Sequence, residues 1–163
     1  MEDELVAAPG SSPGGTPPGM EARLHGALLG VMNVMRGHLE GCAAEHGLSA
    51  QQAVSLFHLG LVDQVSMREL AGELHCDPSN VTGIADRLED RGLVSRGVRA
   101  DDRRVKLLSL TPAGEQLRTE LAEQVNRGVP GLSALAADDQ SELLRILLAV
   151  LDAAGAEPVH SVG

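Results

Sequence analysis

The 163-residue chain is long enough for one domain with a hydrophobic core. Its apolar residues are mainly Leu, Val and Ala, with one Phe and no Tyr or Trp, and its net charge is −10. Leu- and Ala-rich sequences favour helices, so we expect a mainly α fold. No apolar run approaches the roughly 20 residues that span a bilayer, and the first 20 residues lack the features of a signal peptide. Two cysteines fit a reducing compartment, and we expect a cytoplasmic protein with no membrane partner.

The two ends of the chain differ in composition from the segment between them. Residues 1–19 are rich in Pro, Gly and Ser, which predicts a disordered tail, and residues 155–163 are expected to form a flexible C-terminal tail. Residues 20–154 are expected to form a single domain. It begins with a helix over about 20–45, where apolar residues recur at steps of three and four, at Leu24, Leu28, Val31, Met35, Leu39 and Cys42.

That first helix contains four glycines, Gly26, Gly30, Gly37 and Gly41. Each weakens a helix by roughly 1 kcal/mol relative to Ala, so the helix needs packing from the rest of the fold or from another subunit. Two capping boxes follow along the chain. Ser49 with Gln52 predicts the start of a second helix, and Ser66 with Glu69 predicts the start of a third.

A fourth helix is predicted with Asp77 as its N-cap and Pro78 at its first position. Its inner stripe comprises Val81, Ile84, Ala85 and Leu88. Its outward residues are Ser79, Asn80, Thr82, Gly83, Asp86 and Arg87. Two β-prone runs, 93–98 and 105–110, are bridged by residues 99–104 and predict a hairpin. Val65 is expected to add a short strand beside it. Helix, turn, helix and hairpin over 66–111 predict a winged helix-turn-helix, a shape that fits DNA.

The charge distribution is compatible with a nucleic-acid partner despite the acidic total. Between Arg91 and Lys106 the chain has six basic residues and only two acidic ones, a local net charge of +4. Binding depends on the basic footprint rather than on the whole-chain sum. A small basic patch on an acidic body suits a protein that binds DNA through one surface, although a solvated hairpin has the same composition.

Helices outside this central region indicate self-association. Thr111 and Pro112 begin a fifth helix, and a last helix is predicted over about 138–153, with apolar residues on more than one side. Residues 20–46 and 112–154 are therefore expected to be dimerisation helices around a DNA-binding lobe at 48–111, although they could also close one core. A two-fold homodimer presents two recognition helices about 34 Å apart, which matches a palindromic operator in double-stranded DNA.

The runs SMRELAGEL and NVTGIADRLEDRGLVSRGVRADDRRVKLLSLTPAGEQL resemble the multiple antibiotic resistance regulator (MarR) family of winged-helix proteins. The resemblance covers about residues 20–153 and is most specific over 81–117. It implies a homodimeric repressor that leaves its operator when it binds a small effector or is oxidised. Gly83 departs from the pattern, because the family usually has a long side chain there; this shifts the expected affinity toward the wing.

Carried over residue by residue, the resemblance places the fourth helix in the major groove. Ser79, Asn80 and Thr82 would contact base edges or phosphates near its start, and Arg87 would contact DNA further along. In the wing, Asp102 would brace the hairpin by pairing with an arginine, and a tip arginine would enter the minor groove. The remaining predicted DNA-binding residues are Ser66, Arg68, Arg96, Arg99, Arg103 and Arg104.

A small aromatic or lipophilic effector is expected in a pocket lined by Met35, Leu39, Phe57 and His58. A thiol- or metal-responsive regulator of the same fold is an alternative, with Cys42 on the first helix or Cys76 in the helix-turn-helix turn as the candidate thiol. A lone cysteine is more often a small hydrophobic residue. His75, Cys76 and Asp77 also resemble metal ligands, but their spacing matches no confident zinc site.

Enzymatic function has little support in the sequence. There is no nucleophile elbow, phosphate loop or metalloprotease motif, so we predict no catalytic residue, cofactor or bound metal. A winged-helix protein-interaction module that no longer reads DNA is a further alternative, which Gly83 and the acidic body favour and the intact wing motif opposes.

Overall fold

A computed structural model describes residues 19–99, 101–102 and 104–156. The chain divides into two compact units, the first ending at Asn33 and the second beginning at Val34. Among the described residues no helix is long and apolar enough to cross a membrane. The elements, in chain order, are α1 (Met20–Glu45), α2 (Ala50–Leu59), β1 (Val65–Ser66), α3 (Met67–Glu73), α4 (Pro78–Asp90), β2 (Val94–Val98), β3 (Lys106–Leu110), α5 (Pro112–Arg127), the 3-10 helix η1 (Leu132–Ala134) and α6 (Ala137–Ala153).

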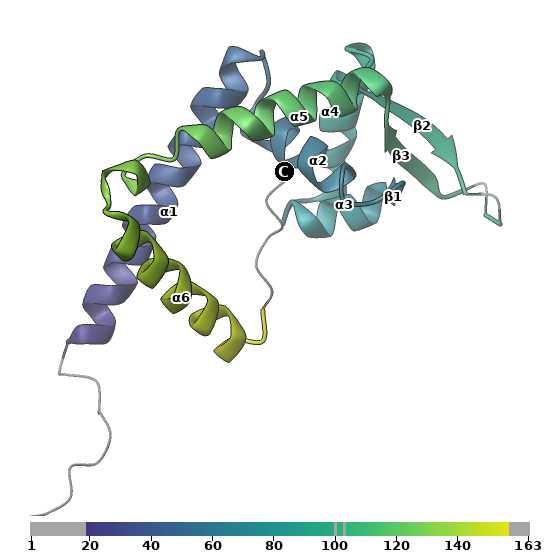
Figure 1. Ribbon diagram of the computed structural model, residues 1–163. Helices are drawn as coiled ribbons and strands as arrows, with labels where there is room; N and C mark the ends of the chain where they lie inside the picture. Colours follow the sequence, from purple (N-terminus) through teal and green to yellow (C-terminus); the bar gives the residue numbers. More distant parts are fainter. Residues whose placement is uncertain (1–18, 100, 103, 157–163) are drawn as a thin grey trace, which may run out of the picture. The chain divides into compact units, whose positions relative to one another are not determined.

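The predicted mainly helical fold with a small β-wing is confirmed. The second unit contains α2, α3 and α4, with the hairpin of β2 and β3 extending beyond the helices as a wing (Figure 1). The strands form an antiparallel sheet in the order β1-β3-β2, in which Val65 pairs with Leu108 and Arg96 pairs with Leu108 from the other side. The short strand expected at Val65 is therefore present. The 3-10 helix η1 was not predicted, since Gly131 and its neighbours indicated only a break.

Both predicted capping boxes form. Ser49 and Gln52 exchange hydrogen bonds at the start of α2, and Ser66 and Glu69 do the same at the start of α3. Each box satisfies two backbone N–H groups that a helix start leaves without partners. Asp77 is the N-cap residue of α4 as predicted, but its side chain makes no capping hydrogen bond.

The ends of α3 and α4 are closed by the same arrangement of backbone hydrogen bonds. After α4, the N–H groups of Gly92 and Leu93 donate to the carbonyls of Glu89 and Leu88, with Gly92 in the left-handed conformation at φ +68°. This is a Schellman motif. After α3 the equivalent residue is His75, at φ 48°, and glycine would adopt that conformation more easily. The turn of the helix-turn-helix therefore contains a histidine in a left-handed backbone conformation that glycine adopts more readily.

The hydrophobic core lies where α2, α3, α4, β3 and the first turns of α5 meet. All four residues of the predicted α4 stripe are buried. Fully buried leucines come from five different elements: Leu56, Leu59, Leu70, Leu88, Leu108 and Leu121. This cluster fixes the orientation of α4, because the apolar inner face of α4 is removed from water by packing against it.

The start of α5 is joined tightly to the turn between α4 and β2. The Thr111 hydroxyl donates to the Gly92 carbonyl at 2.6 Å, and the Thr111 N–H donates to the Leu93 carbonyl at 3.1 Å. Gly114 packs directly on that turn, since a Cβ atom placed on it would lie 1.9 Å from the Leu93 carbonyl oxygen. Only glycine allows α5 to approach the recognition unit this closely.

Arg118, one turn further along α5, is almost fully buried beside the end of α2. Its Nε donates to Glu115 at 3.0 Å, and its Nη2 pairs with the other oxygen of the same carboxylate. Gly60 makes room for the guanidinium, because a Cβ atom there would lie 2.3 Å from the Arg118 Cδ. The hydrogen bonds from Arg118 hold the pKa of the Glu115 carboxyl below its usual range.

Replacing Gly114 with Ala should lower the free energy of unfolding by about 2–4 kcal/mol, because the added methyl group overlaps a backbone carbonyl that cannot move freely. Gly72→Ala is the matched control. It lies in α3, where a Cβ atom would meet no heavy atom within 4 Å, so alanine should stabilise by about 0.5–1 kcal/mol. Urea unfolding followed by circular dichroism measures both. Equal stability of Gly114→Ala and the parent would contradict the packing.

The Glu115–Arg118 pair should make stability depend on acid. Because the folded-state pKa of Glu115 is lowered, its contribution is present above the pKa of the unfolded chain and is lost as pH falls through the folded value. Glu115→Gln should remove less than about 1 kcal/mol near neutrality, since the carboxylate is half exposed and screened. It should also flatten the pH dependence of urea unfolding between neutrality and about pH 3. Glu120→Gln, whose carboxylate accepts from Gln116 instead of an arginine, is the control.

Candidate nucleic-acid interface

The outward face of α4 presents hydroxyl, amide and guanidinium groups. Ser79, Asn80 and Arg87 are exposed, and the first two lie in the first turn of the helix. A helix N-terminus carries partial positive charge and free N–H groups, so short polar side chains beside it suit phosphates and base edges. Gly83 lies between these residues and Arg87, with open space around its Cα. This face therefore allows close backbone approach at its centre and polar contacts at both ends.

A second polar face of α4 is directed at the wing. Asp86 and Glu89, one turn apart, both bind Arg96 of β2: its Nη2 pairs with Asp86, and its Nε lies 3.3 Å from Glu89. Thr82, one turn before Asp86, lines the hollow between α4 and the wing. From the sequence we expected Arg96 to contact the DNA backbone. The structure engages it within the protein.

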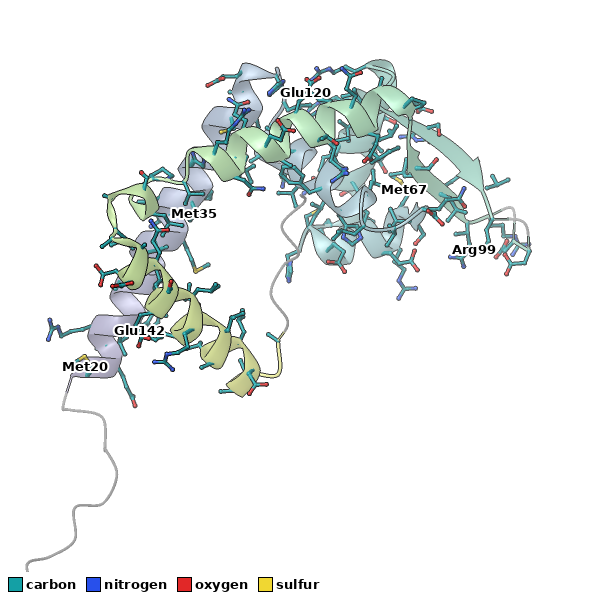
Figure 2. All side chains as sticks on the ribbon, viewed as in Figure 1. Met20, Met35, Met67, Arg99, Glu120 and Glu142 are labelled. Carbon is teal, nitrogen blue, oxygen red and sulfur yellow. The ribbon has the colours of Figure 1, made fainter. Side chains whose placement is uncertain are left out.

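The far end of the wing is held by backbone hydrogen bonds. The Asp102 carboxylate accepts the backbone N–H of Arg104 at 3.0 Å, and the Asp102 backbone carbonyl accepts the N–H of Val105 at 3.0 Å. The backbone N–H of Arg99 donates to the Val105 carbonyl at 3.1 Å. Arg99 lies near the free end of the hairpin (Figure 2). Asp102, which was expected to brace the hairpin by pairing with an arginine, accepts the backbone N–H of Arg104. Arg103 lies outside the described residues.

Arg91 is also used within the protein, and the sequence did not indicate this. Its guanidinium donates to the carbonyls of His46 and Gly47, at 2.9 and 3.0 Å, just after the end of α1. Of the six basic residues counted in the window, Arg91 and Arg96 are thus bound by carbonyls and carboxylates. Of the other described basic residues in this window, Arg104 and Lys106 are exposed and Arg99 is partly exposed.

The two predicted contacts at the start of α3 differ in their environment. Ser66 is buried, and its hydroxyl accepts the N–H of Glu69 as part of the capping box. The side chain and the backbone N–H of Ser66 also hydrogen-bond the Glu69 carboxylate and lower the pKa of that carboxyl, so a negative charge lies beside this position. Arg68 is exposed and available to a phosphate. Ser66 therefore has a structural role here, and Arg68 is the better candidate for DNA contact.

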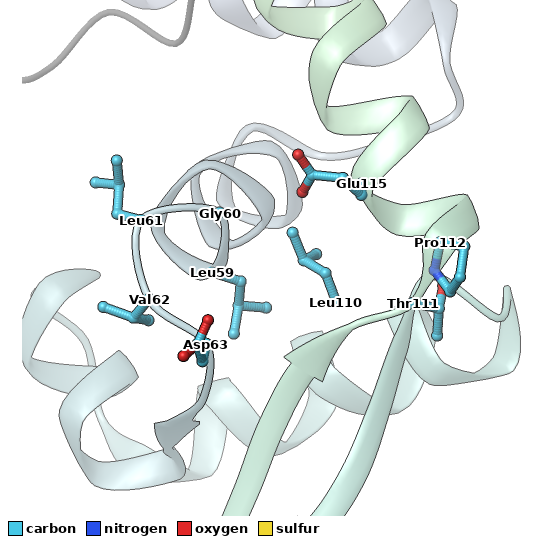
Figure 3. Close-up of a pocket in the computed structure, with 9 residues that line it drawn as sticks. All are labelled: Leu59, Gly60, Leu61, Val62, Asp63, Leu110, Thr111, Pro112 and Glu115. Carbon is cyan, nitrogen blue, oxygen red and sulfur yellow. The ribbon is translucent and has the colours of Figure 1, made fainter.

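The residues predicted to line an effector pocket belong to α1 and α2. Leu39 and Phe57 pack against the core, Met35 is exposed, and His58 faces Glu73 at 3.8 Å. The cavities found in the described part of the chain are lined by residues other than these four. The largest of them, about 720 Å³, lies between the end of α2 and the start of α5 (Figure 3) and is lined by Leu59, Gly60, Leu61, Val62, Asp63, Leu110, Thr111, Pro112 and Glu115. The effector site stays a prediction.

Cys42 is buried on α1, and its Sγ lies 3.9 Å from both ring nitrogens of His38. Burial, followed by the negative charge of Glu45, raises the pKa of this thiol, which disfavours the reactive thiolate. Cys76 is half buried in the helix-turn-helix turn. Within the described part of the chain no group of three or more His, Cys, Asp or Glu side chains is arranged to hold a metal ion.

The sequence did not reveal the roles that depend on tertiary contacts, namely those of Arg91, Arg96, Arg118 and Gly114. A signal was present for one of them. Asp86 and Glu89 are spaced to share a helix face, and an arginine in the following strand is a natural partner for that pair. Gly60 and Gly114 showed only as glycines near helix boundaries, and nothing local revealed what they approach.

Comparison with known proteins supports this geometry. Residues 48–106 match the MarR family. The uncharacterized HTH-type transcriptional regulator YdgJ of Bacillus subtilis is 28% identical over 128 residues, which cover 78% of this chain and 76% of that protein. Apo MarR from E. coli has the same fold, with a TM-score of 0.71, 23% identity, and coverage of 83% of this chain and 97% of that one.

Two further solved structures contain ligands. A mutant of the E. coli MarR in complex with operator DNA has a TM-score of 0.63 and 24% identity, covering 83% of this chain and 99% of that one. CouR from Rhodococcus jostii, bound to p-coumaroyl-CoA, has a TM-score of 0.64 and 24% identity, covering 80% and 92%. The matched winged region, the relative of similar length and the shared fold agree: residues 48–106 match the MarR family, and the chain is a MarR-type winged-helix, DNA-binding transcriptional regulator.

Proposed function

We propose that this regulator is a homodimeric repressor that binds a palindromic operator and is released by a small aromatic or lipophilic effector. The observation that carries the DNA-reading part is the outward face of α4, where Ser79, Asn80 and Arg87 are exposed beside a wing that presents Arg104 and Lys106. An exposed helix with short polar residues at its N-terminus fits the major groove, and a cationic hairpin tip fits the minor groove.

The DNA-contact residues are refined by their surroundings. Ser79, Asn80, Thr82 and Arg87 remain the proposed contacts of α4, with Arg68 at the start of α3 as a phosphate contact. Arg99 and Arg104 of the wing supply further positive charge. Arg103, predicted from the sequence, stays a proposed contact. A mutant of the related E. coli MarR has been solved with operator DNA, which supports the same use of this fold here.

The proposal of a homodimer rests on apolar surface that this chain does not cover by itself. α6 has no buried residue, and five large apolar side chains on it are between 40% and 58% exposed: Leu144, Ile146, Leu147, Leu148 and Val150. α1 likewise exposes Leu28, Leu29, Val31 and Met32. Large apolar side chains exposed on a helix mark an interface, and a second copy of the chain provides matching surfaces by two-fold symmetry.

An effector of aromatic or lipophilic character is proposed because relatives with this fold bind or respond to such molecules. CouR, which shares the fold, binds p-coumaroyl-CoA, and BpsR of Bordetella bronchiseptica is regulated by 6-hydroxynicotinic acid. Both ligands contain a planar ring. Cys42 is buried and the pKa of its thiol is raised, which argues against Cys42 as a thiol sensor.

Arg104→Ala should weaken binding to the operator by roughly 10- to 100-fold, because it removes the exposed cation of the wing tip. The operator is first located by footprinting on the DNA that flanks the gene, and affinity is then measured by fluorescence anisotropy at several salt concentrations. Arg127→Ala removes an equally exposed cation from α5 and should leave affinity within about twofold. Unchanged operator affinity in Arg104→Ala would contradict the proposed role of the wing.

Leu144→Glu should convert the dimer to a monomer, since it places a charge on an exposed apolar position of α6 that the proposed interface desolvates. Sedimentation equilibrium measures the mass, and circular dichroism checks that the helices remain. Ser141→Glu, on the same helix at a polar exposed position, is the control and should remain dimeric. A parent protein that sediments as a monomer at micromolar concentration would refute the proposed assembly.

A further inference from the structure

The recognition helix and the wing are joined by one arginine. Arg96 lies in the middle of β2, and its guanidinium binds the carboxylates of Asp86 and Glu89 on α4. The guanidinium uses two of its nitrogens for two different acids, and its side chain is 30% exposed, less than either carboxylate. This arrangement spans the two parts of the protein that must reach DNA together.

We propose that Arg96 is a positioning residue that holds the wing in register with the recognition helix and does not itself bind a DNA phosphate. The inference rests on the DNA-reading surface proposed above. It concerns how that surface is assembled from α4 and the hairpin.

The packing around Arg96 supports this role. In β2 only Val94 is buried, and the four residues that follow, including Arg96, are exposed. Beneath them lies a hollow of about 470 Å³, lined by Met67, Thr82, Arg96, Gly97, Val98 and Lys106. The outer half of β2 therefore has no close apolar packing against α4. Arg96 attaches β2 to α4 at this point, while β3 is held by its pairing with β1.

The local charge opposes a phosphate contact by Arg96. A phosphate reaching this guanidinium would have to approach Asp86 and Glu89, which already occupy the donors that face α4. The two carboxylates and the one arginine sum to a negative charge, which repels the DNA backbone. Arg99 and Arg104 lie further toward the tip of the same hairpin. Fixing Arg96 against α4 therefore fixes where those cations are presented.

The acidic partners give the decisive test, because charge and positioning predict opposite signs. Asp86→Asn and Glu89→Gln each remove a negative charge near DNA, so a purely electrostatic effect would tighten binding. If Arg96 positions the wing, Asp86→Asn should instead weaken operator affinity by about threefold to thirtyfold, and Arg96→Gln should weaken it similarly. The double variant Asp86→Asn/Arg96→Gln should lose no more operator affinity than either single variant, since both changes break the same contact.

Lys106→Gln is the matched control, an exposed cation of the same wing. It should lower affinity and also reduce the slope of log affinity against log salt by about one, as expected when a phosphate contact is lost. Arg96→Gln that reduces the slope in the same way, together with Asp86→Asn that binds equally or more tightly, would overturn the proposal and make Arg96 a phosphate contact.

A measurement without DNA separates this inference from the proposed function. Backbone ¹⁵N order parameters of the wing, from Arg96 to Arg99 and from Val105 to Leu107, should fall in Asp86→Asn and Arg96→Gln and remain unchanged in Lys106→Gln. Core amides in α2 and α5 serve as the internal reference. Unchanged wing order in both clamp variants would reject the positioning role. Failure of the parent protein to discriminate its operator would instead reject the proposed function.

Discussion

The first turn of α5 lies directly against the Gly92–Leu93 turn, and the attachment of the DNA-reading elements to the rest of the fold depends on this contact. The Leu93 carbonyl leaves no room for a side chain at position 114, which is therefore glycine. Thr111 donates hydrogen bonds to the carbonyls of both residues of the turn. The turn also ends α4 and begins β2. A helix outside the recognition unit is thereby attached, through one rigid backbone contact, to the helix and the hairpin that read DNA. Changes in the orientation of α5 have a direct mechanical path to both.

Electrostatics in this chain are organised by local pairing and not by total charge. Arg91 closes the end of α1, Arg118 binds Glu115 against α2, and Arg96 joins the wing to α4. These three arginines hold the fold in shape, which leaves few cations to contact a ligand. An acidic protein can therefore bind DNA through a small surface, and its specificity then depends on how accurately that surface is assembled.

The fold could be predicted from the sequence wherever a local rule decides it. Capping boxes at Ser49 and Ser66, the apolar stripe of α4 and the hairpin pattern all correspond to elements of the structure. The site was predicted less completely, because its details depend on residues distant in sequence. The spacing of residues along the sequence cannot show that Arg96 binds Asp86, or that the Ser66 hydroxyl is occupied by its capping hydrogen bond. The roles of Gly60 and Gly114 depend on what lies opposite them, which no local pattern contains.

The glycines of α1 have a consequence for the lifetime of the protein in the cell. A Cβ atom at Gly26, Gly30, Gly37 or Gly41 would meet no neighbouring atom within 4 Å, so none of them is there to admit a close contact within the chain. They lower the intrinsic stability of a helix whose large apolar residues from Leu24 to Met35 are already exposed. If a second copy covers this helix, an unassembled chain is the form that proteases cleave first. Turnover would then fall as concentration rises, and the abundance of the regulator would be set partly by its own assembly.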